Sequence, residues 1–180
     1  FAIDFDRDGD MDIVTSGAFG LKWFANSGGT ITGSESFTEH YFYSYTSGGE
    51  QSVYPVDLDQ DGDIDAVSAD GTNDQVLFHS NNGLPNTFNS TTMPQTADYP
   101  KSVYAIDLDS DGDIDILSAS MVDDRIAWYA NDGNQNFTTN TISSSADGAQ
   151  SVYAIDLDRD GDIDVLSADE DDNTISWYEN

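Results

Sequence analysis

The sequence predicts an all-β fold, a β-propeller-type array of four-stranded antiparallel blades, and three observations support this prediction. An acidic nine-residue motif recurs four times, with first residues 53, 50 and 49 positions apart, a spacing typical of propellers and repeat arrays. Strand-like runs rich in β-branched and aromatic residues fill each interval, separated by turn signals such as Asn131-Asp132-Gly133. No segment has a convincing helical period. The 180 residues hold about 3.6 repeats of ~50 residues.

The first two strands of each repeat flank the acidic motif. Strand one is the run SVYAIDLD, as in Ser102–Asp109, and Phe1–Asp6 is its truncated first copy. Strand two follows the glycine of the motif, as in DIDILSA. Because side chains alternate along a strand, strand one presents two apolar faces, formed by Val103 and Ala105 on one side and by Tyr104, Ile106 and Leu108 on the other. We therefore expect neighbouring blades to cover each sheet on both faces.

The third and fourth strands complete each repeat. Strand three is an aromatic run whose copies are LKWFAN, VLFHSN, IAWYAN and ISWYEN, ending at Asn26, Asn81, Asn131 and Asn180. Strand four is anchored by Phe37, Phe88 and Phe137, with Phe42, Met93 and Ile142 five residues on. We expect a single repeat domain over 1–180, with repeats at 1–49 (truncated at its start), 50–99, 100–148 and 149–180 (lacking its last strand).

The acidic motif predicts a site for a hard cation. Its copies are DFDRDGDMD (Asp4–Asp12), DLDQDGDID (Asp57–Asp65), DLDSDGDID (Asp107–Asp115) and DLDRDGDID (Asp156–Asp164). Carboxylates at positions 1, 3 and 5, a glycine at 6 and an acid at 9 can wrap a short loop around one ion with oxygen ligands. Position 7 is expected to supply its main-chain carbonyl, and position 9 to close the shell. The candidate metal ligands are Asp4, Asp6, Asp8, Asp10, Asp12, Asp57, Asp59, Asp61, Asp63, Asp65, Asp107, Asp109, Asp111, Asp113, Asp115, Asp156, Asp158, Asp160, Asp162 and Asp164.

Calcium is the expected ion, with about four bound, one per repeat. Calcium accepts six to eight oxygen ligands, whereas magnesium prefers a rigid octahedron that retains waters. The chain has no cysteine and two histidines, which argues against zinc and copper because their sites use sulfur or imidazole. Five carboxylates in nine residues repel one another, so a bound divalent cation is expected to stabilise each loop.

The residues after each motif exclude an EF-hand. An EF-hand loop has a glutamate at position 12 and continues into a helix, whereas position 12 holds Thr15, Ser68, Ser118 and Ser167. A β-type run follows each of these positions. Dockerin loops also precede helices, thrombospondin-type repeats carry cysteines, and the glycine-rich nonapeptide of calcium β-rolls is missing. A strand-loop-strand site remains.

Together these features give the chain a family resemblance. Tandem units with DxDxDGDxD, a following apolar strand and a WYxN strand resemble the FG-GAP and VCBS-type repeats, which are related to the calcium-binding propeller of integrin α-subunits. The resemblance spans essentially the whole chain. It implies calcium loops between the first and second strands of each blade, in a secreted or cell-surface protein used for adhesion, recognition or scaffolding. Clear FG and GAP landmarks are missing, so integrin-like ligand recognition is not implied.

Charge restricts the partners. The chain has 35 acidic and 5 basic residues and a formal net charge of −30, which repels nucleic acids and anionic membranes. We therefore expect no nucleic-acid partner and no membrane insertion.

Extracellular calcium is high enough to saturate even weak sites, which favours an external location. An incomplete ring of blades leaves apolar faces to be covered, so we expect self-association or flanking propeller blades.

Three functional hypotheses follow. The first is a non-catalytic calcium-binding propeller for adhesion, recognition or assembly, with a protein or glycan ligand. The second is a calcium-dependent, lectin-like carbohydrate-binding module, and the third is a polysaccharide lyase or hydrolase on a propeller scaffold. Repetition argues against catalysis, which needs one asymmetric set of groups.

The remaining polar and aromatic candidates are interpreted as structural. His79 aligns with Phe24, Tyr129 and Tyr178, so we expect it to have a packing role. His40 is expected at a solvent-facing position. Trp23, Phe78, Trp128 and Trp177 share one repeat position and are expected to pack between blades. No catalytic residue is predicted.

Overall fold

The computed structural model describes residues 1–17, 19–28, 37–44, 49–83, 87–95 and 97–180. Within these ranges the chain forms β-strands and no helix. The strands are β1 (Ala2–Ile3), β2 (Asp12–Gly17), β3 (Gly20–Asn26), β4 (Phe37–Ser44), β5 (Glu50–Val56), β6 (Asp65–Asp70), β7 (Gln75–Asn81), β8 (Phe88–Thr92), β9 (Pro100–Ile106), β10 (Asp115–Ser120), β11 (Arg125–Asn131), β12 (Phe137–Ser143), β13 (Ala149–Ile155), β14 (Asp164–Asp169) and β15 (Thr174–Tyr178). The all-β prediction is confirmed.

Consecutive strands pair into antiparallel sheets that correspond to the predicted blades. In the described part of the chain, the sheets are β1-β2-β3-β4, β5-β6-β7-β8, β9-β10-β11-β12 and the three-stranded β13-β14-β15. Every pair of neighbouring strands is antiparallel. The phenylalanines predicted to anchor strand four are the first residues of β4, β8 and β12. The last sheet contains three strands.

The boundaries around the acidic motif differ from the prediction. Strand one of the third repeat was expected to reach Asp109, but β9 ends at Ile106 and β10 begins only at Asp115. The eight residues between them curl into a loop because their carboxylates accept hydrogen bonds from nearby backbone N–H groups. An extended strand cannot make these local hydrogen bonds.

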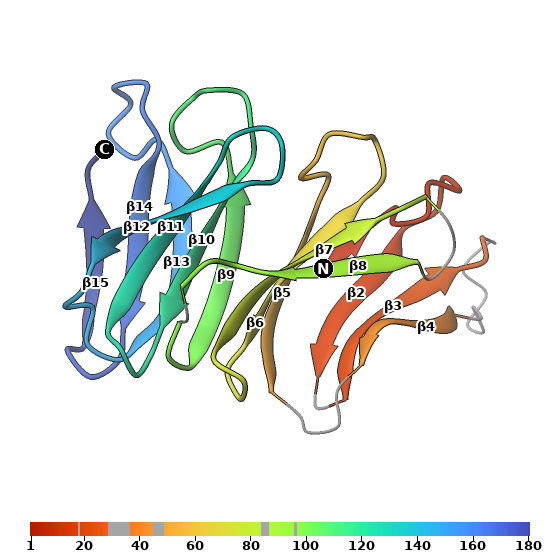
Figure 1. Cartoon of the computed structure of the whole chain (residues 1–180), viewed down its shortest axis with the longest axis horizontal. Helices are drawn as coiled ribbons and strands as arrows, with labels where there is room; N and C mark the ends of the chain where they lie inside the picture. Colours follow the sequence, from red (N-terminus) through yellow and green to blue (C-terminus); the bar gives the residue numbers. More distant parts are fainter. Residues whose placement is uncertain (18, 29–36, 45–48, 84–86, 96) are drawn as a thin grey trace.

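The sheets follow one another in an open arc (Figure 1). The first strands lie innermost, where β5 contacts β9 and β9 contacts β13. Aromatic rings line these strands, with centroid separations of 5.1 Å for Phe1–Tyr54, 4.9 Å for Tyr54–Tyr104 and 4.9 Å for Tyr104–Tyr153. Such contacts between aromatic rings are favourable beyond the area that they bury. The ladder of rings fixes the spacing of the blades along the inner edge.

Each pair of neighbouring sheets shares an apolar core. Val103 and Ala105 pack with the second sheet, whereas Tyr104, Ile106 and Leu108 pack with the fourth. The predicted division of strand one into two covered faces is therefore confirmed. A third cluster joins the first and second sheets. In the described residues, no helix is long and apolar enough to span a membrane.

Candidate metal centres

All four acidic motifs form loops between the first and second strands of a sheet, along the upper edge of the arc in Figure 1. Position 6 is a glycine with φ between +98° and +110° in each loop, a conformation that strongly favours glycine. Position 4 is also left-handed but carries a side chain, at Arg7, Gln60, Ser110 and Arg159. These two left-handed residues fold each loop back on itself.

Backbone N–H groups hold the carboxylates inside the loop. In the third loop, the N–H of Gly112 donates to Asp107 Oδ2 at 3.0 Å, and the N–H of Asp111 donates to Asp109 Oδ1 at 3.3 Å. The N–H of Asp113 donates to Asp111 Oδ1 at 2.9 Å. A carboxylate has about four acceptor positions, so these hydrogen bonds leave it able to bind a cation.

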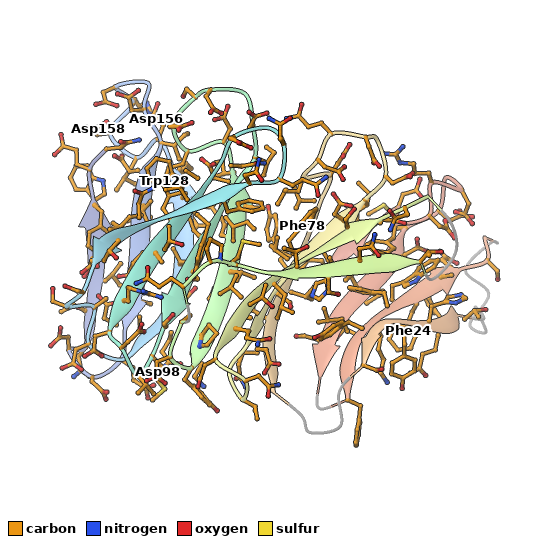
Figure 2. The ribbon with its side chains drawn as sticks, viewed as in Figure 1. Phe24, Phe78, Asp98, Trp128, Asp156 and Asp158 are labelled. Carbon is orange, nitrogen blue, oxygen red and sulfur yellow. The ribbon has the colours of Figure 1, made fainter. Side chains whose placement is uncertain are left out.

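Three carboxylates converge in every loop. Their oxygens lie within 4.8 Å of one another, in the clusters Asp4/Asp6/Asp8, Asp57/Asp59/Asp61, Asp107/Asp109/Asp115 and Asp156/Asp158/Asp164. Figure 2 shows Asp156 and Asp158 together at the tip of the fourth loop. Asp4 Oδ1 is buried without a hydrogen-bond partner among the described residues. A buried acceptor without a donor is unfavourable, and an all-oxygen cluster suits a hard divalent cation, so the residues fit calcium.

The aspartate at position 9 also connects three segments of its blade. In the third repeat, Asp115 Oδ2 accepts the N–H of Leu108 at 3.0 Å and Asp115 Oδ1 accepts the N–H of Asn131 at 2.8 Å. The other repeats make the same pair of hydrogen bonds through Asp12, Asp65 and Asp164. Burial raises the pKa of Asp65 to about 7, although the N–H groups of Asn81 and Leu58 lower it. Sequence reasoning assigned this position only a ligand role.

The carboxylate at position 7 lies outside the converging clusters. A Cβ atom at Gly83 would lie 2.6 Å from Asp63 Oδ2, and one at Gly133 would lie 2.5 Å from Asp113 Oδ2. Gly28 approaches Asp10 in the same way. These glycines have positive φ, and each stands two residues after the asparagine that ends strand three. Only glycine permits this close approach, and the recurring Asn-x-Gly was the available signal.

Neighbouring loops also contact one another. Arg7 Nη2 lies 4.0 Å from Asp57 Oδ2, and Arg7 Nη1 lies 3.8 Å from Asp63 Oδ1. Gln60 Nε2 donates to the carbonyl oxygen of Gly112 at 2.7 Å. Both contacts begin at position 4 of one loop and end on the next loop. The first three candidate sites are therefore connected in a row.

Of the residues outside the loops that were expected to pack between blades, Trp23 and Phe78 are buried, whereas Trp177 is 47% exposed. His79 is fully buried, with Ser68 Oγ 2.9 Å from Nε2 and Ser90 Oγ 2.8 Å from Nδ1, which confirms its packing role. His40 is half-buried, and its ring stacks on Trp23 with centroids 4.6 Å apart. Antiparallel pairing places these two residues opposite each other on one face.

An array of antiparallel sheets, each with an acidic loop between its first two strands, defines a propeller-type repeat protein. The chain belongs to the FG-GAP-like repeat family, whose model matches residues 4–68, 57–118 and 107–167. No curated protein matches the chain.

Among solved structures, the chain is similar to a lectin of Agrocybe aegerita that specifically recognises non-reducing terminal N-acetylglucosamine. The TM-score is 0.61 at 18% sequence identity, and the match covers 93% of this chain. It covers 46% of the lectin chain, so this chain spans about half the length of that structure. At this identity the likeness establishes the fold alone.

Proposed function

We propose that the chain is a non-catalytic calcium-binding propeller protein that serves adhesion, recognition or assembly outside the cell. The observation that carries the proposal is the convergence of three carboxylates in each of the loops that connect first and second strands. Bound calcium would neutralise part of the repulsion within each loop. Because each loop belongs to one blade, calcium then stabilises the fold blade by blade.

The chemistry of the chain supports a structural role for the ion. Catalysis requires a distinctive acid, base or nucleophile, whereas the clusters recur in equivalent positions of successive sheets. His79 is buried between two serines, and His40 stacks on Trp23. Neither histidine is placed as a general base for an exposed substrate.

Calcium titration tests the proposal. After removal of metal, calorimetry is expected to detect about four calcium sites per chain, and magnesium is expected to bind more weakly. At free calcium a hundredfold above the dissociation constant, each site adds about 2.7 kcal/mol to the free energy of unfolding. Chelation should therefore lower the melting temperature markedly. An unchanged melting temperature on chelation would refute the structural role.

Carbohydrate binding is the second candidate function, and the fold shared with the lectin favours it. A partly exposed aromatic ring beside carboxylates and amides can bind the apolar face of a sugar, while the polar groups bind its hydroxyls. Trp128, Asp109 and Asn180 provide these groups around one groove. Calcium-dependent retention on a glycan array that is lost in Trp128→Ala would support this function, and absence of retention would exclude it for the glycans on the array.

The outer faces of the end blades are proposed to pack against other blades, through self-association or flanking repeats. In the fourth repeat, the exposed fractions of Tyr153, Leu157, Ile175 and Trp177 are 47%, 48%, 74% and 47%. Large apolar patches of this kind mark interaction surfaces. Sedimentation that finds a compact, stable monomer in calcium would contradict self-association.

A further inference from the structure

Three tyrosines stand in a row along the inner edge of the arc. Tyr54 on β5, Tyr104 on β9 and Tyr153 on β13 hold the same position in successive first strands, which contact one another in that order (Figure 1). Tyr104 has a phenol ring on each side, with centroid separations of 4.9 Å to Tyr54 and 4.9 Å to Tyr153. Phe1 holds the equivalent position in the first sheet, so packing alone does not require the three hydroxyl groups.

The hydroxyl groups of the row meet. Burial, followed by the neighbouring hydroxyl groups of Tyr54 and Tyr153, raises the pKa of Tyr104. Tyr104 therefore remains a neutral phenol, whose O–H can donate to a neighbouring hydroxyl oxygen or accept from its O–H. The ortho carbons of a phenol lie beside its hydroxyl group. Hydroxyl groups that meet therefore also bring the ortho carbons of neighbouring rings together.

The orientation of the rings suits a bond between them. The angle between ring planes is 59° for Tyr54 and Tyr104, and 55° for Tyr104 and Tyr153. Two phenol rings joined directly through ortho carbons are twisted in this way, because coplanar rings would bring their hydroxyl groups into contact. The torsion that rotates a tyrosine ring is soft, so a small rotation can close the remaining distance.

The row is also open to small molecules. Tyr54 and Tyr104 are half-buried, and Tyr153 is 47% exposed. Tyr129, in contrast, is 0% exposed. A small oxidant can therefore reach the row, whereas the surrounding side chains shield Tyr129.

We propose that Tyr104 is a site of oxidative cross-linking, at which its ring forms a dityrosine bond with Tyr54 or Tyr153. The oxidant is a peroxide. Each of two tyrosines loses one electron and one proton from its O–H, and the two phenoxyl radicals form a C–C bond between ortho carbons. The two ortho hydrogens then move to the oxygens and restore the phenols. The two electrons and two protons reduce one hydrogen peroxide to two water molecules. The bond joins neighbouring blades covalently and does not depend on calcium.

Photo-oxidation of the intact chain tests the proposal, with persulfate as the peroxide and light-excited ruthenium tris(bipyridyl) as its activator. Persulfate accepts the two electrons and leaves as two sulfates. Trypsin then releases residues 102–125, in which Tyr104 is the sole tyrosine. We expect this peptide to be joined to 23–101, which contains Tyr54, or to 126–159, which contains Tyr153, with the loss of two hydrogen atoms. The monomer should also gain the blue fluorescence of dityrosine.

Conservative variants identify the residues that couple. Tyr104→Phe keeps the ring and should abolish both cross-links, because Tyr104 stands between the other two phenols. Tyr54→Phe should leave only the link to Tyr153. Tyr41→Phe removes a phenol that is 46% exposed on the first sheet and, as the matched control, should leave both links. Oxidation in urea should lower their yield about tenfold or more, because the rings are no longer held side by side.

The cross-linked monomer should melt roughly 10 °C above the unoxidised chain, because the bond closes a loop of about fifty residues in the unfolded state. An unchanged melting temperature would overturn the role of the bond in joining blades. Equal yields in the folded and the urea-unfolded chain would show that the row does not direct the coupling. Residues 102–125 joined to a second copy of themselves would place the coupling between chains. Either result, or undiminished cross-linking in Tyr104→Phe, would overturn the proposal.

Discussion

Gln135 Nε2 donates a hydrogen bond to Asp59 Oδ2 at 3.0 Å, although 76 residues separate them. Gln135 lies in the turn between β11 and β12, and Asp59 belongs to the carboxylate cluster of the preceding blade. Burial raises the pKa of Asp59, although the N–H of Asp61 lowers it. A side chain in the turn of one blade therefore forms a hydrogen bond with a candidate cation ligand of the neighbouring blade.

Replacing Gln135 by glutamate should make the stability of the chain more dependent on calcium. A carboxylate in place of the amide repels Asp59 in the absence of an ion, by about 1 kcal/mol at this exposed position. Bound calcium would offset that repulsion. Melting in chelator and in calcium should therefore show a larger loss for Gln135→Glu in chelator. Gln135→Ala removes the hydrogen bond without adding charge, and equal behaviour of the two variants would contradict this account.

Replacing Arg7 by serine, the residue at the same position in the third loop, should strengthen calcium binding at the second loop. The guanidinium lies 4.0 Å from Asp57 Oδ2 and competes electrostatically with a cation. Its side chain is 48% exposed, so the gain should stay within about 1 kcal/mol, or roughly fivefold in affinity. The amide resonance of Gly62, which donates to Asp57, can report this site by NMR titration.

Arg159→Ser is the matched control for this prediction. Arg159 holds position 4 of the fourth loop and has the same left-handed backbone, with φ of 68°. It forms no ion pair within the described ranges. If Arg159→Ser changed the Gly62 titration as much as Arg7→Ser, the effect would be one of net charge and not of contact.

The sequence was sufficient to predict the sheets because their determinants are local and repeated. Phe137, predicted to anchor a fourth strand, is the first residue of β12, because turn residues precede it and β-type residues follow. The alternation of Val103 with Tyr104 identified two covered faces, and the packing clusters confirm them. The convergence of Asp4, Asp6 and Asp8 could likewise be predicted, since three alternating acids and a glycine stand in one short loop.

The remaining features depend on how distant segments meet. Nothing in the sequence relates Gln135 to Asp59, because that contact depends on the rotation of one blade against another. The pattern of acids could not separate the two roles of Asp115, because the same carboxylate can bind an ion or accept backbone N–H groups. The stacking of His40 on Trp23 required the register of β3 and β4, which a single strand does not specify.

Asp115→Ala should destabilise the chain with or without calcium, whereas Asp107→Ala should do so mainly in calcium. Removing Asp115 leaves the buried N–H groups of Leu108 and Asn131 unpaired, with an expected loss of about 3 kcal/mol in the free energy of unfolding. Asp107 accepts only exposed hydrogen bonds within its loop. Urea denaturation in chelator and in calcium separates the two effects. A similar loss for both variants in chelator would show that position 9 has no special connecting role.

Stability should fall in mild acid because of His79. Burial lowers the pKa of His79 to about 3, so the imidazole stays neutral in the folded chain while it becomes protonated in the unfolded chain near its ordinary pKa of about 6.5. The stabilisation is fully present above that unfolded pKa and decreases as the pH falls below it, by about 1.4 kcal/mol per pH unit.

The variant His79→Gln removes this titration and retains groups that can bond Ser68 and Ser90. Its free energy of unfolding, measured at fixed calcium between pH 7.5 and pH 5, should fall less steeply than that of the unmodified chain. The difference between the two chains cancels the titration of the carboxylates that they share. If the free energy of unfolding fell equally steeply with pH in His79→Gln and in the unmodified chain, His79 would take up its proton equally in the folded and unfolded states. That result would contradict the burial of His79.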